Sequence, residues 1–117
     1  MFSLDELREL EPGTVVYVMP EEEEIREEMK TKQRLDTSCI LVKSRCSESR
    51  LNNHVGTYAV RLFDTITRPY TSPLWYPVRD GYHFYYTQQE ANKAAVISIS
   101  IKIQCVENLR ELIDYLS

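Results

Sequence analysis

The dipeptide Asp80-Gly81 stands between two aromatic runs, residues 74–79 and residues 82–86. Asp-Gly between such runs favours a two-residue type I′ turn, because both central residues of that turn need a positive φ. The pattern therefore predicts a β-hairpin in which Tyr76 opposes Tyr85. Pro77 cannot donate a hydrogen bond to a sheet, so its strand is expected at a sheet edge.

Four further segments read as strands. Residues 14–19, 37–45 and 55–63 are rich in β-branched and aromatic side chains, and the third of them alternates large apolar residues with smaller or polar ones. Residues 96–104 alternate isoleucine with serine, lysine and glutamine, which is the pattern of a strand with one buried face. With the two arms of the hairpin, the sequence predicts five to six strands.

Helices are predicted between these strands and at both ends. Ser3 and Glu6 form a capping box that opens a short helix, and Pro12-Gly13 ends it. Pro20 opens a second helix, whose first turns carry a run of glutamates. A second capping box predicts a helix over residues 87–95, and leucines at helical spacing predict a last helix from about residue 106.

These elements predict a single α+β domain over residues 1–117, with a strongly curved antiparallel sheet or small barrel of five to six strands. Helices are expected at the N-terminus, in the acidic segment and at the C-terminus. The layout from Gly13 to Ala95, including the capped sequence Tyr86-Thr87-Gln88-Gln89-Glu90-Ala91, resembles small Src-homology or Tudor-like barrels of phage and mobile-element proteins. The resemblance implies a barrel but carries over no functional residue, and the glutamate helix and the last strand and helix depart from it.

Net charge, cysteine count and apolar runs limit the binding partners and the cellular compartment that the sequence suggests. The net charge of −4 disfavours broad binding of phosphate backbones. An odd count of three cysteines favours reduced thiols, and the acidic first residues lack the pattern of a secretory signal. No run of about 18 apolar residues predicts a membrane span. Cytoplasmic residence is the expectation.

The chemistry-bearing residues do not form a recognisable active site. The three glycines are far apart, which argues against a phosphate-binding loop. Cys39, Cys46 and His54 could supply three zinc ligands, but their spacing is not that of a zinc site, and thiols packed as small apolar groups are the simpler interpretation. An unfamiliar active site around Asp64, Asp80 and His83 stays open as a third alternative. We therefore expect no enzyme, no cofactor and no metal.

Binding of another macromolecule is the function that the sequence favours. The acidic helix and the exposed residues of the hairpin are the candidate contacts with a protein partner that has a basic surface, because charge complementarity and Trp, Tyr and Arg side chains are typical of interfaces. The competing interpretation is that the glutamates are a solvated face and that the aromatics fill the core. The candidate partner-binding residues are Glu23, Glu24, Glu27, Glu28, Trp75, Arg79, Tyr82, Phe84 and Tyr86.

One alternative uses a different partner. Arg61, Arg68 and Arg79 lie in the middle of the chain, and with the hairpin aromatics they could bind single-stranded RNA or DNA by stacking and charge. For a viral gene, the protein interpretation would suit an inhibitor of a host or defence protein that acts by charge mimicry, which is an inference by analogy.

Overall fold

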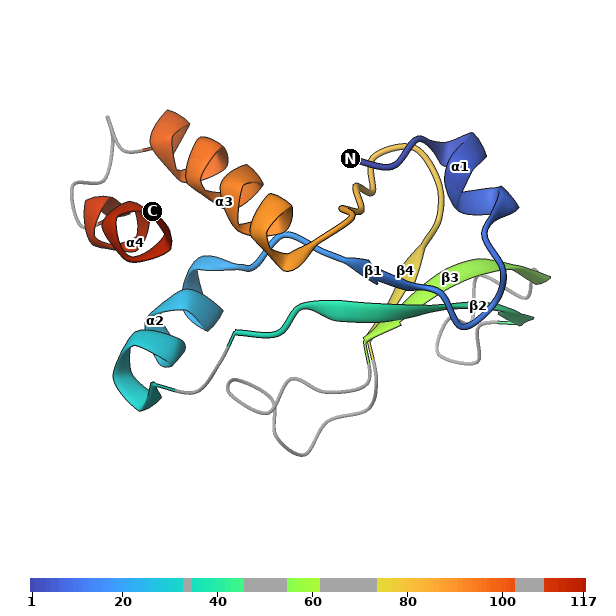
Figure 1. Ribbon diagram of the computed structural model, residues 1–117, viewed down its shortest axis with the longest axis horizontal. Helices are drawn as coiled ribbons and strands as arrows, with labels where there is room; N and C mark the ends of the chain where they lie inside the picture. The colour runs from blue at the N-terminus through green and yellow to red at the C-terminus, as the bar shows by residue number, and fades with distance from the viewer. Residues whose placement is uncertain (33–34, 46–54, 62–73, 103–108) are drawn as a thin grey trace.

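The computed structural model describes residues 1–32, 35–45, 55–61, 74–102 and 109–117 (Figure 1). Three helices, α2, α3 and α4, lie together at one end of an antiparallel sheet, and α1 lies near the other end. The elements are α1 Leu4–Glu9, β1 Val15–Tyr17, α2 Glu22–Thr31, β2 Ser38–Arg45, β3 Val55–Arg61, β4 Leu74–Pro77, α3 Gln88–Lys102 and α4 Arg110–Leu116. The prediction of an α+β fold is confirmed.

The sheet has four strands in the order β1-β2-β3-β4, and each pair of neighbours is antiparallel. In register, Val16 faces Cys39, Leu41 faces Ala59, and Ala59 faces Tyr76. The side chains of this face pack with α1 and with the segment after β4 to form the sheet cluster, which we define as Leu7, Val16, Val18, Cys39, Leu41, Ala59, Val78 and Phe84. Tyr58 and Val60 are buried on the opposite face, so β3 is covered on both sides.

The predicted barrel of five to six strands is wrong, because the part of the chain that the structure describes forms an open sheet of four strands. Within the described residues, the outer edge of β1 pairs with another segment at one bridge: Tyr17 and Tyr85 exchange two backbone hydrogen bonds, of 3.1 and 2.8 Å. A single bridge does not make a ladder that closes the sheet. The expectation that Pro77 lies in an edge strand is confirmed, since β4 is the last strand in the order.

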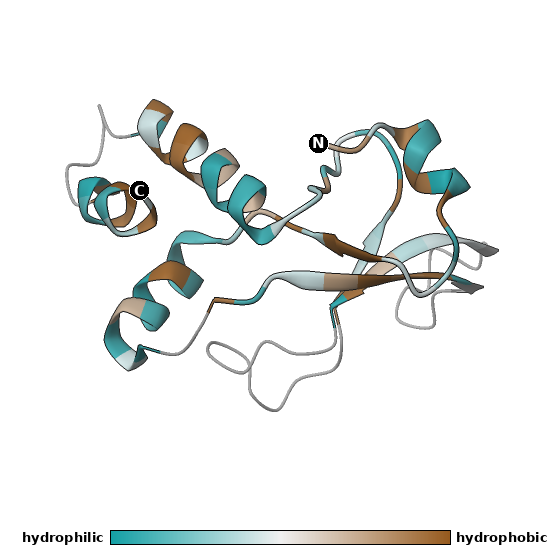
Figure 2. Ribbon diagram, in the orientation of Figure 1, coloured by the Kyte–Doolittle hydropathy of each residue, from teal (hydrophilic) through white to brown (hydrophobic). Residues whose placement is uncertain are grey.

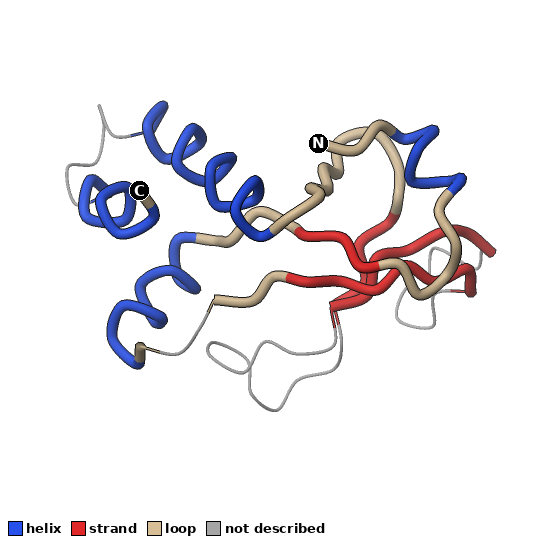
Figure 3. The backbone as a smooth tube through the Cα atoms, viewed as in Figure 1, coloured by secondary structure: helices blue, strands red, loops and turns tan. Residues whose placement is uncertain are grey.

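The second arm of the predicted hairpin is not a strand. A turn is present, in which the Tyr82 amide donates to the Arg79 carbonyl at 3.2 Å and Gly81 has a φ of +94°. Among the described non-glycine residues Lys32 alone has a positive φ, so Asp80 lacks the conformation that a type I′ turn requires. The chain therefore leaves β4 as a loop (Figure 3) and places Phe84 in the sheet cluster instead of pairing it with β4.

The predicted strand over residues 96–104 is also wrong, because helix α3 continues to Lys102. Ala91, Ala95 and Ile99 follow each other at four-residue spacing and are all buried, which is a helical face. Ile97 and Ile101 are left 65% and 75% exposed. The packing of one face against other helices thus outweighs the strand preference of the isoleucines.

The three helices at the end of the sheet share a core of their own. We call it the helical cluster: Ile25, Leu35, Ala95, Ile99, Leu109 and Leu112. In Figure 2 helices α2 and α3 each carry hydrophobic and hydrophilic segments, as helices with one packed face do. Among the described residues the helical cluster shares no member with the sheet cluster.

Candidate protein-binding surface

The glutamates at the start of the acidic helix α2 lie partly in the interior and partly at the surface. Pro20 is buried, Glu21 and Glu23 are exposed, and Glu24 is buried with 4% of its surface exposed. Its neighbour Ile25 is fully buried on the face that joins the helical cluster. The run of glutamates is therefore not one uniform surface.

Glu24 forms a buried ion pair with Arg61 of β3. Both oxygens of its carboxylate accept from the guanidinium, with Nη1 at 3.0 Å from Oε1, and Nη2 also donates to the Asp36 carbonyl at 2.8 Å. The side chains are only 6% and 4% exposed. The bidentate geometry fixes the position of α2 relative to the sheet.

This ion pair corrects two expectations. Glu24 is not available to a partner, because the fold itself covers its carboxylate. Arg61 is not part of a basic surface, because its charge is matched by Glu24. Arg68 lies outside the described residues, so of the three arginines in the nucleic-acid alternative only Arg79 is placed on the surface.

The other predicted acidic residues remain near the surface of α2. Glu27 forms an ion pair with Lys30 at 3.7 Å, and Glu23 is exposed. Glu28 lies beside Tyr115 of α4, where burial and then a hydrogen bond with Glu28 raise the pKa of the Tyr115 hydroxyl. Glu23 is therefore exposed, whereas Glu27 and Glu28 are half-buried and have contacts within the protein.

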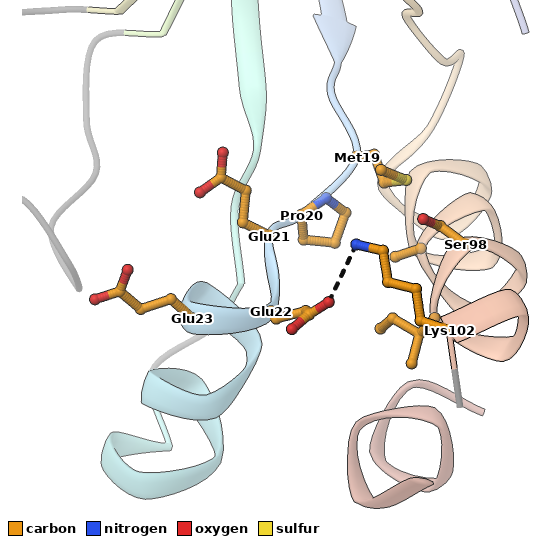
Figure 4. A pocket seen from close by; sticks show the side chains of 9 residues that line it. Met19, Pro20, Glu21, Glu22, Glu23, Ser98 and Lys102 are labelled. Carbon is orange, nitrogen blue, oxygen red and sulfur yellow. Dashed lines mark hydrogen bonds and ion pairs between the residues drawn. The ribbon is translucent and has the colours of Figure 1, made fainter. Parts of the chain in front are cut away.

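A groove with a volume of about 380 Å³ lies where the start of α2 meets the second half of α3 (Figure 4). Its apolar lining comes from both sides, and the Glu22 carboxylate faces Lys102, whereas the carboxylates of Glu21 and Glu23 point away from α3. Lys102, in the last turn of α3, reaches across to Glu22 with 3.4 Å between Nζ and Oε1. The lining residues are Met19, Pro20, Glu21, Glu22, Glu23, Ala95, Ser98, Ile99 and Lys102.

The α3 side of this groove is not predicted from the sequence. Ser98, Ile99 and Lys102 fall in the predicted strand over residues 96–104, so nothing in the sequence brings them to the acidic segment. The available signal was the four-residue spacing of Ala91, Ala95 and Ile99, which continues the capped helix past residue 95. That spacing competes with the stronger alternation of isoleucines.

The predicted aromatic contacts separate into buried and exposed residues. Phe84 is 1% exposed and belongs to the sheet cluster, which corrects its assignment as a partner contact. Trp75 is half-buried and packs edge-on against Tyr58 with 5.6 Å between ring centroids. Arg79 is exposed, with its guanidinium 5.5 Å from the ring centroid of the exposed Tyr82.

Tyr86 is exposed but is engaged by the N-terminal segment. Its ring lies 4.1 Å from the Phe2 ring, and its hydroxyl donates to Glu6 at 2.9 Å. The Ser3 amide and then Tyr86 lower the pKa of Glu6, and the same hydrogen bond raises the pKa of Tyr86. Tyr86 therefore holds the N-terminal segment against the body of the protein.

The acidic and aromatic residues do not form one surface. Helix α2 and the loop after β4 lie apart in Figure 1, on different sides of the molecule. The groove beside α2 and the Arg79–Tyr82 pair are therefore separate candidates. The groove is the better candidate, because it combines a concave shape, an apolar lining and charge.

The residues considered for chemistry are not arranged as an active site in the described part of the chain. Burial raises the pKa of the Cys39 thiol to about 12, which keeps it protonated. Asp80 and His83 are exposed, and Asp64, Cys46 and His54 lie outside the described residues. Among the residues that are described, no three His, Cys, Asp or Glu side chains gather where a metal could bind.

Comparison with known proteins finds no matching family model, no similar curated protein and no similar solved structure. In the described ranges of the chain, every helix is too short or too polar to cross a bilayer.

Proposed function

We propose that this protein acts without catalysis, by binding a basic segment of another protein in the groove between α2 and α3. The observation that carries the proposal is the composition of the groove and its edge: Glu22 faces the groove, Glu21 and Glu23 lie beside it at the start of α2, and Met19 and Ile99 belong to an apolar lining. Lysine and arginine side chains combine an aliphatic stem with a cationic head, so they complement both parts. Cytoplasmic residence belongs to the same proposal.

Two features support a protein partner over single-stranded nucleic acid. The net charge is −4, and Arg61 neutralises Glu24 inside the protein. An inhibitor that occupies a basic site on a host or defence protein is one form that such binding takes, and this extension rests on analogy. Catalysis around Asp80 and His83 is not part of the proposal.

The test is the fluorescence anisotropy of a labelled lysine-rich peptide titrated with the protein. The double variant Glu21→Gln/Glu23→Gln removes two exposed carboxylates beside the groove, at the start of α2. Each exposed charge contact contributes about 0.2–1 kcal/mol, so binding should weaken roughly two- to thirtyfold. Raising the ionic strength should weaken the binding of the wild type as well.

A matched control separates the groove from net charge. Glu9→Gln/Glu11→Gln removes the same charge from exposed residues in and after α1, away from α2 (Figure 1). Its affinity should stay close to that of the wild type. Equal losses in the two double variants, or tighter binding to a single-stranded oligonucleotide than to the peptide, would contradict the proposal.

A further inference from the structure

The sequence Asp80-Gly81 lies at an exposed turn between β4 and α3 (Figure 3). Residues 79–83 are all exposed, and Asp80 and Gly81 belong to no helix or strand. In the whole sequence this is the one place where an aspartate or asparagine directly precedes a glycine. Its exposure and its small neighbour therefore set Asp80 apart from the other aspartates.

The surroundings of Gly81 leave its amide open to reaction. Gly81 has a φ of +94°, and beyond its chain neighbours no described atom lies within 4 Å of the place that a Cβ would occupy. Within the described part of the chain the Gly81 amide donates to no acceptor. The turn is closed there by one hydrogen bond, which the Tyr82 amide donates to the Arg79 carbonyl at 3.2 Å. A change of conformation at Asp80-Gly81 therefore has one hydrogen bond to break.

An aspartyl carboxyl group and the next amide nitrogen can close a five-membered ring, because adjacent residues hold the two groups close together. The Gly81 nitrogen attacks Cγ of the protonated Asp80 carboxyl, a C–N bond forms, and the carboxyl hydroxyl leaves with the amide proton as water. Glycine favours this step, since it has no Cβ to obstruct the approach. Water then opens the succinimide by breaking one of its two C–N bonds. Breakage at Cγ restores aspartate, whereas breakage at the main-chain carbonyl carbon of residue 80 leaves the chain running through Cβ and Cγ, which is L-isoaspartate.

From these observations we propose that Asp80 is a modification site, at which L-isoaspartate forms spontaneously in the folded protein. The product is a substrate for the class of carboxyl methyltransferases that recognise L-isoaspartate. Modification at Asp80 does not depend on binding at the groove between α2 and α3.

Isoaspartate at residue 80 changes the surface of the loop. It adds one atom to the main chain between Val78 and Phe84, which are both buried. The exposed turn between them, which places Arg79 beside Tyr82, absorbs the added length. The modification therefore alters the Arg79–Tyr82 pair and leaves the sheet cluster in place.

The experiment incubates the folded protein at constant pH and temperature and follows the peptide that contains residue 80 by liquid chromatography and mass spectrometry. The isomer has the same mass as the original peptide but elutes separately, and an isoaspartyl methyltransferase with radioactive S-adenosylmethionine counts it independently. The same chain unfolded in guanidinium chloride gives the rate without the turn. Because one hydrogen bond restrains the turn, the rate in the folded protein should be about two- to tenfold lower than in the unfolded chain.

Asp80→Glu is the matched control. It keeps the negative charge at an exposed position but has to close a larger ring, so no isomer should form at residue 80. Asp5 and Asp114 are controls within the same chain, since they lie in α1 and α4 and precede larger residues. Far-UV circular dichroism checks that Asp80→Glu is folded, and if it is not, the comparison of the folded and unfolded wild type decides alone.

Three results would overturn the modification site. The first is a rate in the folded wild type that is more than about tenfold below that of the unfolded chain, or no isomer in either state. The second is equal formation of isoaspartate at Asp5 or Asp114. The third is the same amount of isomer at residue 80 in folded Asp80→Glu.

Discussion

The buried ion pair between Glu24 and Arg61 permits a sharp test of what holds the helices on the sheet. Arg61→Met leaves the Glu24 side chain, which is 6% exposed, without its cation. Removing one partner of a buried pair costs about 3–5 kcal/mol, because the other charge stays desolvated. Domains of this size are stable by about 5–15 kcal/mol, so the variant should lie close to the limit of folding. A melting temperature lower by roughly 10–20 °C is expected.

The double variant Glu24→Leu/Arg61→Met should be far more stable than the sum of the single losses. Apolar residues of similar size in place of a buried pair are often neutral or stabilising, because no charge remains to be solvated. Adding two single losses of about 3–5 kcal/mol predicts roughly 6–10 kcal/mol, whereas we expect the double variant to lose about 1 kcal/mol or less. The difference is the coupling energy of the pair.

Urea denaturation measures these free energies with two independent probes. Far-UV circular dichroism reports on the helices, and the fluorescence of Trp75, the single tryptophan, reports on β4. Lys30→Met is the matched control, since Lys30 pairs with Glu27 on the surface at 3.7 Å, and its loss should be within about 0.5 kcal/mol. A loss below about 1 kcal/mol in Arg61→Met, or additive losses in the double variant, would refute the reasoning.

Three more predictions test the corrected secondary structure and the surface contacts. Ile99→Ala should cost about 2–5 kcal/mol in denaturation while Ile97→Ala stays within about 0.5 kcal/mol, whereas a one-sided strand would make both costly. Burial raises the pKa of the Cys39 thiol to about 12. In a variant with the other two cysteines replaced by serine, Cys39 should therefore react with a thiol reagent only after unfolding. Fast labelling of the native protein would contradict its burial. Tyr86→Phe should move the lowered pKa of Glu6 back towards its ordinary value in a carboxyl NMR titration. Because the folded-state pKa of Glu6 is lowered, its hydrogen bonds stabilise the fold at a pH above the unfolded pKa, and this stabilisation is lost as the pH falls through the folded pKa. Tyr86→Phe should therefore lose less stability than the wild type when the protein is acidified. An unchanged Glu6 titration in Tyr86→Phe would contradict the contact.

Local signals were sufficient for much of the fold. The capping box is present at α1, where the Ser3 hydroxyl accepts from the Glu6 amide at 3.1 Å and the Glu6 carboxylate accepts from the Ser3 amide at 3.2 Å. The first three strands and the acidic helix also lie within or close to their predicted ranges. These elements are specified by caps, breakers and β-branched runs, which act between neighbouring residues.

The errors occur where distant contacts decide the conformation. Phe84 enters the sheet cluster and so leaves the pairing that Asp80-Gly81 favoured, and the face formed by Ala95 and Ile99 turns an alternating segment into a helix. The same limit applies to the candidate site. Nothing local to Glu24 or to Arg61 indicates that the two would meet, because the pairing depends on how α2 docks on β3.

The alternation of isoleucine and serine in the second half of α3 has a practical consequence for anyone who handles the protein. Residues 96–101 carry no charge and are rich in β-branched side chains, which is the composition of segments that stack into intermolecular cross-β assemblies. As long as α3 stays helical, its backbone N–H and C=O groups are hydrogen-bonded within the helix and cannot pair with another chain. The rate of aggregation on heating or storage should therefore depend more on how often α3 unfolds than on the net charge of the protein.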